Sequence, residues 1–351
     1  MEIARLAGVS IGTVDRVVHN RGRVSEETKK RVQRIIEETG YRPNIFASRL
    51  SRSKLYRFGV LMPHPSQDSR FWQLPLRGIE KAAEELRTHG IQVDYYFFDK
   101  YATAKSSFDG LCRQVLGELP DGLLVAPVIP GWTREFILRL PEHYPYVFFD
   151  SSLPNTFPIS NIIQDSYQSG VLSAKLSELL AGGTGKIGIF QLSPTDFHLL
   201  ERARGFRSYF AGKPGITCIE NVVDGARKTE SYQRVFSALL KAHPDLKGVF
   251  VTNAATFDAS EFLRRRQQQK NIFIIGYDLI PENIRYMNEG WIDFLINPRP
   301  EMQGYQGIFA LYRWSVLGET VEPSVMMPID IITKENLAYY LRDEKNDENC
   351  R

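Results

Sequence analysis

Three polar residues of this chain stand where short apolar runs end. Asp150 directly follows residues 146–149, Asn253 closes the run 248–252, and Asp278 comes just after residues 272–276. Carboxylate and amide groups can bond two hydroxyl groups at once, and the ligands of open α/β sheets bind beyond the carboxyl ends of the strands. Each residue could instead cap a strand end or bond a local turn. The positions therefore favour binding of a small polar ligand without requiring it.

Alternating segments predict the scaffold that would hold these groups. Apolar runs typical of buried strands alternate with stretches of helical periodicity. The expected strands are 57–63, 92–98, 122–126, 146–149, 186–191, 217–223, 248–252 and 272–276, and the expected helices are 71–89, 103–116, 133–138, 167–180, 199–210, 230–242 and 258–267. This alternation predicts parallel βαβ units, and its two series predict two similar lobes.

The first fifty residues predict a separate helical unit. A first helix should pack through Ile3, Leu6 and Ala7 and end at Gly8, which can adopt a positive φ angle. Ser10 can cap a second helix over residues 11–19, and a third should extend from residue 25 to 40.

Two helices joined by such a turn form a helix-turn-helix, whose second helix enters the major groove of DNA, although any small three-helix unit gives a similar pattern. The candidate DNA contacts on and around the second helix are Ser10, Ile11, Gly12, Thr13, Asp15, Arg16, Asn20 and Arg23.

The charge distribution supports contact with nucleic acid at this end of the chain. Residues 1–57 hold 13 Lys and Arg against 6 Asp and Glu, a net charge of +7. The remainder holds 31 against 35, a net charge of −4. A basic segment on a mildly acidic body is typical of a protein that binds phosphates through one end.

The composition also indicates the cellular compartment of the protein. No stretch approaches the roughly 18–20 apolar residues of a membrane span, so we expect a cytoplasmic protein without a membrane partner. The three cysteines are widely spaced and form no Cys-x-x-Cys pair, which is typical of reduced thiols.

Three further signals do not predict catalysis or a cofactor. Residues 182–186 contain the glycines and lysine of a phosphate loop, but they precede a strand, and Ile187 stands where a magnesium-binding hydroxyl is needed. Residues 264–266 fit a solvated helix end better than a second nucleic-acid patch. The six histidines show no metal-ligand spacing and no nucleophile–base arrangement occurs, so we expect no enzyme, metal or cofactor.

Three motifs extend the pattern of the helical unit. They are Gly-Val-Ser-x-x-Thr-Val-x-Arg-Val at 8–17, Val-Ser-x-x-Thr at 24–28 and Gly-Tyr-x-Pro-Asn-x-x-Ala-x-x-Leu at 40–50. Together they resemble the LacI/GalR family of bacterial transcription regulators. The resemblance implies a hinge helix that starts at Asn44 and inserts Leu50, with Ala47 beside it, into the minor groove at the operator dyad. An apolar wedge of this kind unstacks a base step and bends the duplex.

Residues 58–341 resemble the type I periplasmic sugar-binding proteins, as the effector domains of that family do. The resemblance implies that strand-end residues bind the effector, namely Ser69, Phe71, Trp72, Asp150, Arg202, Asn253, Asp278 and Asn297. The chemistry agrees, because aromatic faces can cover the apolar side of a sugar ring while carboxylates and amides bond its hydroxyl groups.

The expected fold is an all-α helix-turn-helix DNA-binding head joined to a two-lobed α/β domain of the type I periplasmic-binding-protein kind. We expect the DNA-binding domain at 1–43, the hinge helix and linker at 44–57, the ligand-binding and dimerisation domain at 58–341 and a charged tail at 342–351.

By resemblance, the protein is a homodimer that binds double-stranded operator DNA and a sugar or sugar derivative, and it represses carbohydrate-utilisation genes. Two other classes of protein share parts of this pattern. A transport-type binding protein would need a signal peptide in place of the basic head, and an architectural DNA-binding protein would have no use for polar and aromatic residues at strand ends. The sequence leaves open whether the effector releases or strengthens operator binding.

Overall fold

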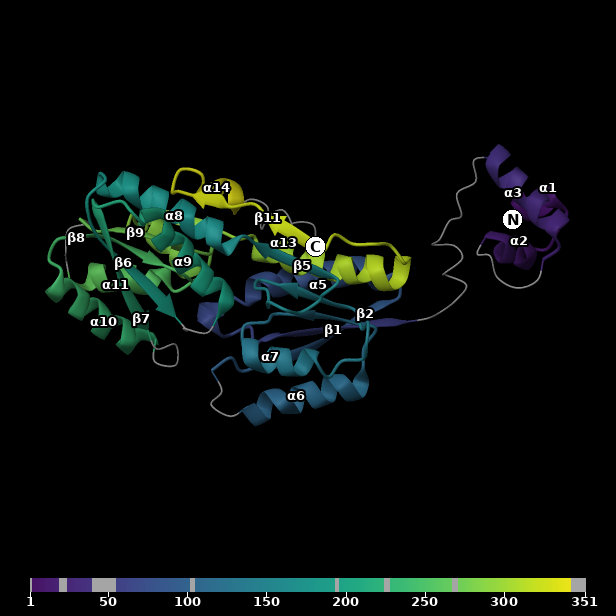
Figure 1. The fold of residues 1–351 in the computed structure, drawn as a ribbon, viewed down its shortest axis with the longest axis horizontal. Coiled ribbons are helices and arrows are strands. Elements are labelled where there is room, and N and C mark those ends of the chain that lie inside the picture. The colour runs from purple at the N-terminus through teal and green to yellow at the C-terminus, as the bar shows by residue number, and fades with distance from the viewer. Residues whose placement is uncertain are drawn as a thin grey trace. The chain divides into compact units, whose positions relative to one another are not determined.

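The computed structural model describes residues 2–18, 24–39, 55–101, 105–192, 196–223, 228–266 and 271–341 (Figure 1). The chain divides into two compact units, Met1–Lys54 and Leu55–Arg351, and each has its own core. None of the described helices combines the length and the apolar character that a membrane crossing requires.

The described residues of the first unit form three helices: α1 (Glu2–Ala7), α2 (Ile11–Val18) and α3 (Glu26–Thr39). Gly8 ends α1 with a φ angle of +62°. The Ser10 hydroxyl accepts a hydrogen bond of 3.2 Å from the backbone N–H of Thr13, which caps α2 as the sequence predicts. Ser25 caps α3 in the same way. The core of this unit consists of Ile3, Ala4, Ala7, Val14, Val17, Val32 and Ile35.

One apolar residue of the first helix was placed wrongly from the sequence. Leu6, expected in the core, is 48% exposed, and Ala4 is buried instead. The buried face of α1 is centred between Ile3, Ala4 and Ala7, and Leu6 lies roughly 100° of helix rotation away from that centre.

Two six-stranded sheets form the second unit. The first lobe has the strand order β11-β5-β4-β3-β1-β2 and the second has β12-β10-β9-β8-β6-β7. Among the described residues, neighbouring strands pair in parallel, except that β10 and β12 are antiparallel. The strands of the first lobe are β1 (Tyr56–Pro63), β2 (Ile91–Phe98), β3 (Gly122–Val125), β4 (Tyr146–Phe149), β5 (Ser160–Gln164) and β11 (Ser324–Met327). Those of the second are β6 (Gly185–Leu192), β7 (Ile216–Val223), β8 (Leu246–Val251), β9 (Phe273–Tyr277), β10 (Phe294–Asn297) and β12 (Asp330–Ile332).

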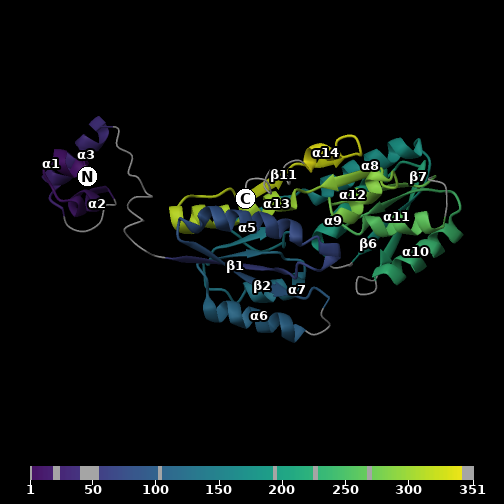
Figure 2. The same cartoon turned by 180° about the vertical axis from the view of Figure 1, so that it is seen from behind.

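Helices cover both faces of each sheet (Figures 1 and 2). In the first lobe α5 (Gln73–Arg87) and α13 (Pro300–Leu311) lie on one face, and α6 (Lys105–Glu118) and α7 (Pro130–Ile137) on the other. In the second lobe α8 (Ser166–Ala181) and α9 (Phe197–Phe210) share one hydrophobic core with the sheet. The opposite core contains residues of α10 (Lys228–Ala242), α11 (Thr256–Arg265) and α12 (Pro281–Asn288). Three shorter helical segments are η1 (Asp68–Arg70), η3 (Tyr312–Leu317) and α14 (Leu337–Tyr340).

Five neighbouring strands have the same arrangement in both sheets. The order β5-β4-β3-β1-β2 of the first lobe corresponds, strand by strand along the chain, to the order β10-β9-β8-β6-β7 of the second. The sequence therefore predicted two similar α/β lobes correctly. It did not predict the strands β5, β10, β11 and β12.

The chain passes between the lobes three times, from β5 to α8, from β10 to α13 and from β11 to β12. One buried side chain joins all three crossings. The amide nitrogen of Gln164, at the end of β5, donates hydrogen bonds of 3.3 Å to the carbonyl oxygen of Asn297 and 2.9 Å to that of Pro328. Any rotation of one lobe relative to the other must bend the chain at these crossings, since they are the covalent links between the two sheets.

Helix α9 lies unusually close to α8. A Cβ atom at Gly205 would stand 2.0 Å from the carbonyl oxygen of Tyr167, and one at Gly170 would stand 2.0 Å from that of Arg202. Only glycine fits at these two contacts. They fix the position of α9, which carries several residues of the site described below.

Candidate functional site

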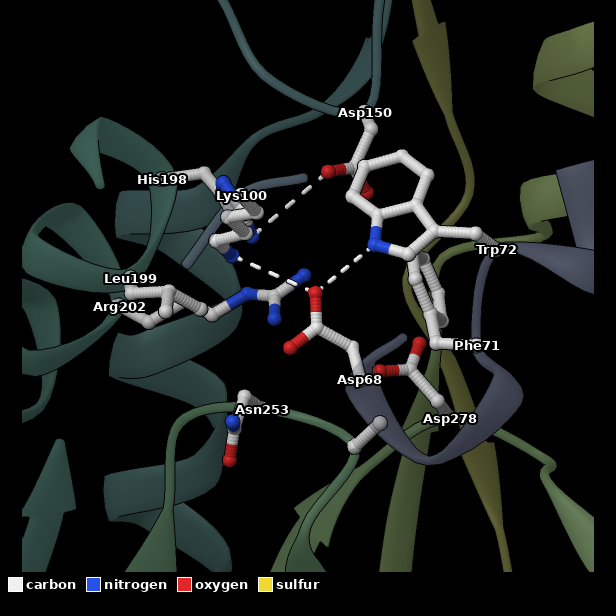
Figure 3. A pocket seen from close by; sticks show the side chains of 11 residues that line it. Asp68, Phe71, Trp72, Lys100, Asp150, His198, Leu199, Arg202, Asn253 and Asp278 are labelled. Carbon is white, nitrogen blue, oxygen red and sulfur yellow. Dashed lines mark hydrogen bonds and ion pairs between the residues drawn. The ribbon is translucent and has the colours of Figure 1, made fainter. Parts of the chain in front are cut away.

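A pocket lies between the two lobes, and most of its residues follow strands or begin helices at the carboxyl edges of the two sheets (Figure 3). It encloses about 370 Å³ when the open space at its mouth is counted. The first lobe contributes Asp68, Phe71, Trp72, Lys100 and Asp150, and the second contributes His198, Leu199, Arg202, Asn253, Ala254 and Asp278.

Two aspartates occupy corresponding positions in the two lobes. Asp150 follows β4 with a φ angle of +67°, and Asp278 follows β9 with a φ angle of +72°. Such left-handed geometry is uncommon outside glycine and is concentrated at functional sites. Both carboxyl groups are buried, and Asp150 Oδ2 and Asp278 Oδ1 accept no hydrogen bond from the protein. Each lobe thus presents one unused buried acceptor to the pocket.

Burial controls the protonation of these two carboxyl groups. Loss of hydration raises the pKa of Asp278 to about 7, while the guanidinium group of Arg202 opposes the rise. Loss of hydration also raises the pKa of Asp150, and His198, whose Nε2 lies 3.9 Å from Asp150 Oδ2, opposes it. Asp278 therefore changes charge near neutral pH.

A buried lysine connects the two lobes. Lys100 Nζ, from the loop after β2, lies 3.0 Å from Asp196 Oδ2 of the second lobe and 3.5 Å from Asp68 Oδ2 of the first. Burial alone would lower the pKa of Lys100, but the two carboxylates raise it well above its ordinary value. Burial would raise the pKa of Asp196, yet His198 and Lys100 lower it to about 2. Both members of this pair are charged at neutral pH.

Aromatic side chains form the wall of the pocket in the first lobe. The rings of Phe71 and Trp72 meet edge to face with centroids 5.1 Å apart. The indole N–H of Trp72 donates a hydrogen bond of 2.8 Å to Asp68 Oδ2, and the hydroxyl of Tyr101 donates to Asp68 Oδ1. These bonds fix both the indole ring and the carboxylate of Asp68.

Arg202 extends from α9 into the pocket (Figure 3). Its Nη1 donates a hydrogen bond of 2.8 Å to the carbonyl oxygen of Thr252, and its guanidinium carbon lies 3.7 Å from the centre of the Tyr277 ring. Its buried Nε has no partner in the protein. The side chain is thus held in place and keeps a donor that the protein does not use.

The pocket contains six of the eight effector-binding residues predicted from the sequence. Ser69 and Asn297 do not line it. Ser69 has a φ angle of +59° in the turn before α5, and its neighbours Asp68 and Phe71 line the pocket instead. The side-chain oxygen of Asn297 accepts a hydrogen bond of 3.0 Å from the backbone N–H of Arg299, in the second crossing between the lobes.

Three polar residues of the site were missed. Lys100 comes two residues after β2, so the strand-end argument could have found it. His198 stands four residues before Arg202, on the same face of α9, and Asp68 stands beside the predicted Ser69. Their pairing across the lobes, however, leaves no local pattern in the sequence.

The predicted DNA contacts fall partly on described residues. Ser10, Gly12 and Arg16 of the α2 region are exposed, and Thr13 is half-buried. Ile11 and Asp15 belong to α2, but their side chains lie outside the described part of the structure. Asn20, Arg23, Asn44, Ala47 and Leu50 also lie outside the described residues, so their roles stay predictions.

Comparison with known proteins decides the family. Residues 58–319 match the periplasmic binding protein domain, and residues 1–44 match the bacterial regulatory proteins of the lacI family. The chain belongs to the lacI family. The family and the fold class inferred from the sequence are thereby confirmed. The first match covers most of both lobes of this lacI-family protein, and the second covers its three amino-terminal helices.

Among relatives, the HTH-type transcriptional regulator MalR of Streptococcus pneumoniae is 31% identical over 179 residues, which is 48% of this chain and 50% of the relative. The ribose operon repressor of Halalkalibacterium halodurans is 24% identical over 301 residues, 80% of each chain. The chain spans only about half the length of several curated relatives that it matches, MalR among them.

Solved structures show the same two-lobed fold. A protein from Bacteroides fragilis described as a LacI transcriptional regulator aligns with a TM-score of 0.77 and 30% identity, over 82% of this lacI-family chain and all of the other. A solute-binding protein from Burkholderia graminis in complex with D-arabinose aligns with a TM-score of 0.74 at 20% identity, over 82% of this chain and 98% of the other. At that identity the likeness concerns the fold alone.

Proposed function

We propose that this lacI-family protein is a sequence-specific DNA-binding transcription regulator, and not an enzyme, whose operator affinity is set by a sugar bound between its two lobes. The observation that carries the proposal is the pair of buried carboxylate oxygens that accept no hydrogen bond from the protein, Asp150 Oδ2 from the first lobe and Asp278 Oδ1 from the second. A buried acceptor without a donor is costly, and a ligand with hydroxyl groups would satisfy one acceptor in each lobe.

The remaining lining residues suit a sugar ring. Phe71 and Trp72 offer apolar aromatic surface, and Arg202 Nε and the side chain of Asn253 can bond hydroxyl groups. The names of relatives agree, since they include a ribose operon repressor. Ser69 and Asn297 stand outside this lining, so we assign ligand contact to the other six predicted residues.

A ligand that contacts both lobes can act as a switch. It stabilises the arrangement in which both sets of contacts form, and it shifts the population only by its difference in affinity for the two arrangements. The change in lobe arrangement that the ligand favours would take place at the crossings joined by Gln164.

The proposed DNA contacts are those of α2 and the hinge sequence. Ser10, Gly12 and Arg16 are exposed on or beside α2, and by resemblance Leu50 enters the minor groove. A homodimer would place two α2 helices on half-sites of a near-palindromic operator.

The proposed organisation is a DNA-binding domain at 1–43, a hinge at 44–57, a ligand-binding and dimerisation domain at 58–341 and a tail at 342–351. We also propose that the protein is located in the cytoplasm and represses carbohydrate-utilisation genes.

Two measurements on the full chain test the proposal. A thermal-shift panel of pentoses, hexoses and disaccharides should contain members that raise Tm, because a ligand bound only to the folded state stabilises it. Selection from a pool of random-sequence DNA duplexes should enrich a near-palindromic site. A panel without any stabilising sugar would contradict the sensor, and a pool without enrichment would contradict sequence-specific binding.

A further inference from the structure

The helix end that faces the pocket already holds an anion. Asp196 is the N-cap residue of α9, the fourteen-residue helix that presents His198, Leu199 and Arg202 to the pocket. The N-terminus of a helix attracts negative charge and is a common binding site for phosphate. Asp196 places a fully buried carboxylate at this helix end, although the carboxylate accepts no capping hydrogen bond from α9.

Each cation of the described pocket already has partners in the protein, and Arg202 keeps its Nε as an unused donor. Lys100 lies between Asp196 and Asp68, and His198 Nδ1 lies 2.8 Å from Asp196 Oδ1. Arg202 bonds the carbonyl oxygen of Thr252 and covers the ring of Tyr277. Sites for phosphate or carboxylate ligands normally offer uncommitted Arg or Lys side chains.

Acidic groups outnumber the cations in this cluster. The carboxyl groups of Asp68, Asp150, Asp196 and Asp278 face Lys100, Arg202 and the titratable His198. The two unpartnered oxygens belong to carboxyl groups, which call for hydrogen-bond donors. A phosphate or carboxylate group on the ligand would bring further acceptors and negative charge into a buried site where acidic groups already outnumber the cations, which is unfavourable.

We propose that the effector carries no phosphate or carboxylate group, and that Asp196 contributes to this selectivity by placing a negative charge beside the pocket and neutralising Lys100. The inference rests on the proposed function, since it names the chemical class of ligand for the same pocket. The inference goes beyond the proposed function because it excludes phosphorylated sugars and sugar acids as effectors.

Matched pairs of sugars test the selectivity by isothermal titration calorimetry. Suitable pairs are ribose with ribose 5-phosphate, glucose with glucose 6-phosphate and galactose with galacturonate. For any pair that binds, the unmodified sugar should bind at least about 100-fold more tightly, because that is the order of the penalty for an unpaired buried charge. A phosphorylated or acidic sugar that binds more tightly than its partner would overturn this inference and leave the sensor function standing. If no sugar of either kind binds, the sensor function itself is contradicted.

Inorganic phosphate tests the role of Asp196 without knowledge of the effector. In the full chain, potassium phosphate should raise the Tm of the wild type no more than potassium chloride of equal ionic strength does. Asp196→Asn removes the carboxylate from the N-terminus of α9 and exposes Lys100 to the pocket, so phosphate should raise the Tm of that variant by several degrees more than chloride.

Asp165→Asn is the matched control, because Asp165 caps α8 through a hydrogen bond from Gln168, whereas the carboxylates beside Lys100 are those of Asp196 and Asp68. It should gain no response to phosphate. A phosphate response in the wild type, or equal responses of the two variants, would overturn the role given to Asp196. If Asp196→Asn does not fold, Asp68→Asn removes the other carboxylate beside Lys100 and should give the same gain in response.

Discussion

At the scale of single residues, the pocket is organised by carboxyl groups that local sequence could locate only in part. Asp150 and Asp278 were predictable, because parallel strands bring their carboxyl ends to one edge of a sheet. Lys100, His198 and Asp68 were not predicted, because their roles depend on pairing between lobes: Lys100 lies 96 positions from its partner Asp196.

Asp278 predicts how stability without ligand depends on pH. Its folded-state pKa of about 7 exceeds the ordinary value of 3.8, so the folded protein binds this proton more tightly than the unfolded chain does. The contribution of this proton to the free energy of unfolding is complete below pH 4 and is lost as the pH rises to about 7, by on the order of 2–4 kcal/mol.

Asp278→Asn should remove this contribution. Denaturant unfolding of both proteins at pH 5 and pH 8 gives the comparison, and the variant should lose less of its free energy of unfolding between the two pH values than the wild type. The same pH dependence in both proteins would show that Asp278 does not titrate in this range.

At the scale of elements, periodicity located most of the strands and helices, but it missed the helices α12 and α13 and four short strands. β5, β10, β11 and β12 have three to five residues each, too few for a pattern of alternation to be distinctive. The strand β11 pairs with β5 although more than 150 residues separate them, and no local signal encodes such a partner. Leu6 shows a related limit, since the buried face of a helix with six residues is set by its neighbours.

The contact of α8 with α9 gives a prediction about stability. Gly205→Ala would place a Cβ atom 2.0 Å from the carbonyl oxygen of Tyr167, so α9 must move away from α8. We expect a loss of about 1–3 kcal/mol in the free energy of unfolding, as for other overpacked sites, together with weaker sugar binding, because α9 carries Arg202.

The control for this substitution is Gly117→Ala in α6, where a Cβ atom would meet nothing within 4 Å. Alanine is the better helix former, so this variant should be as stable as the wild type or more stable. Denaturant unfolding and sugar titration of both variants provide the measurements. A Gly205→Ala protein as stable as the control would show that the close packing of α9 is not required.

At the scale of the whole molecule, the repeated βαβ pattern predicted two similar lobes, and the basic first 57 residues predicted a separate DNA-binding unit. The triple crossing between the lobes could not be predicted in the same way. It requires α13 to return to the first lobe after β10 of the second sheet, which depends on contacts between distant segments. The hydrogen bonds of Gln164 are therefore visible only in the structure.

The central claim is that the pocket and the DNA-binding unit are energetically coupled. Fluorescence anisotropy with a labelled operator duplex, selected as described above, measures the Kd for DNA with and without a saturating sugar from the panel. The account predicts a change of about 5–150-fold, and an equal change in sugar affinity when operator is present, since coupling between two binding sites is reciprocal. A sugar that binds the pocket and leaves the operator Kd unchanged would contradict the account.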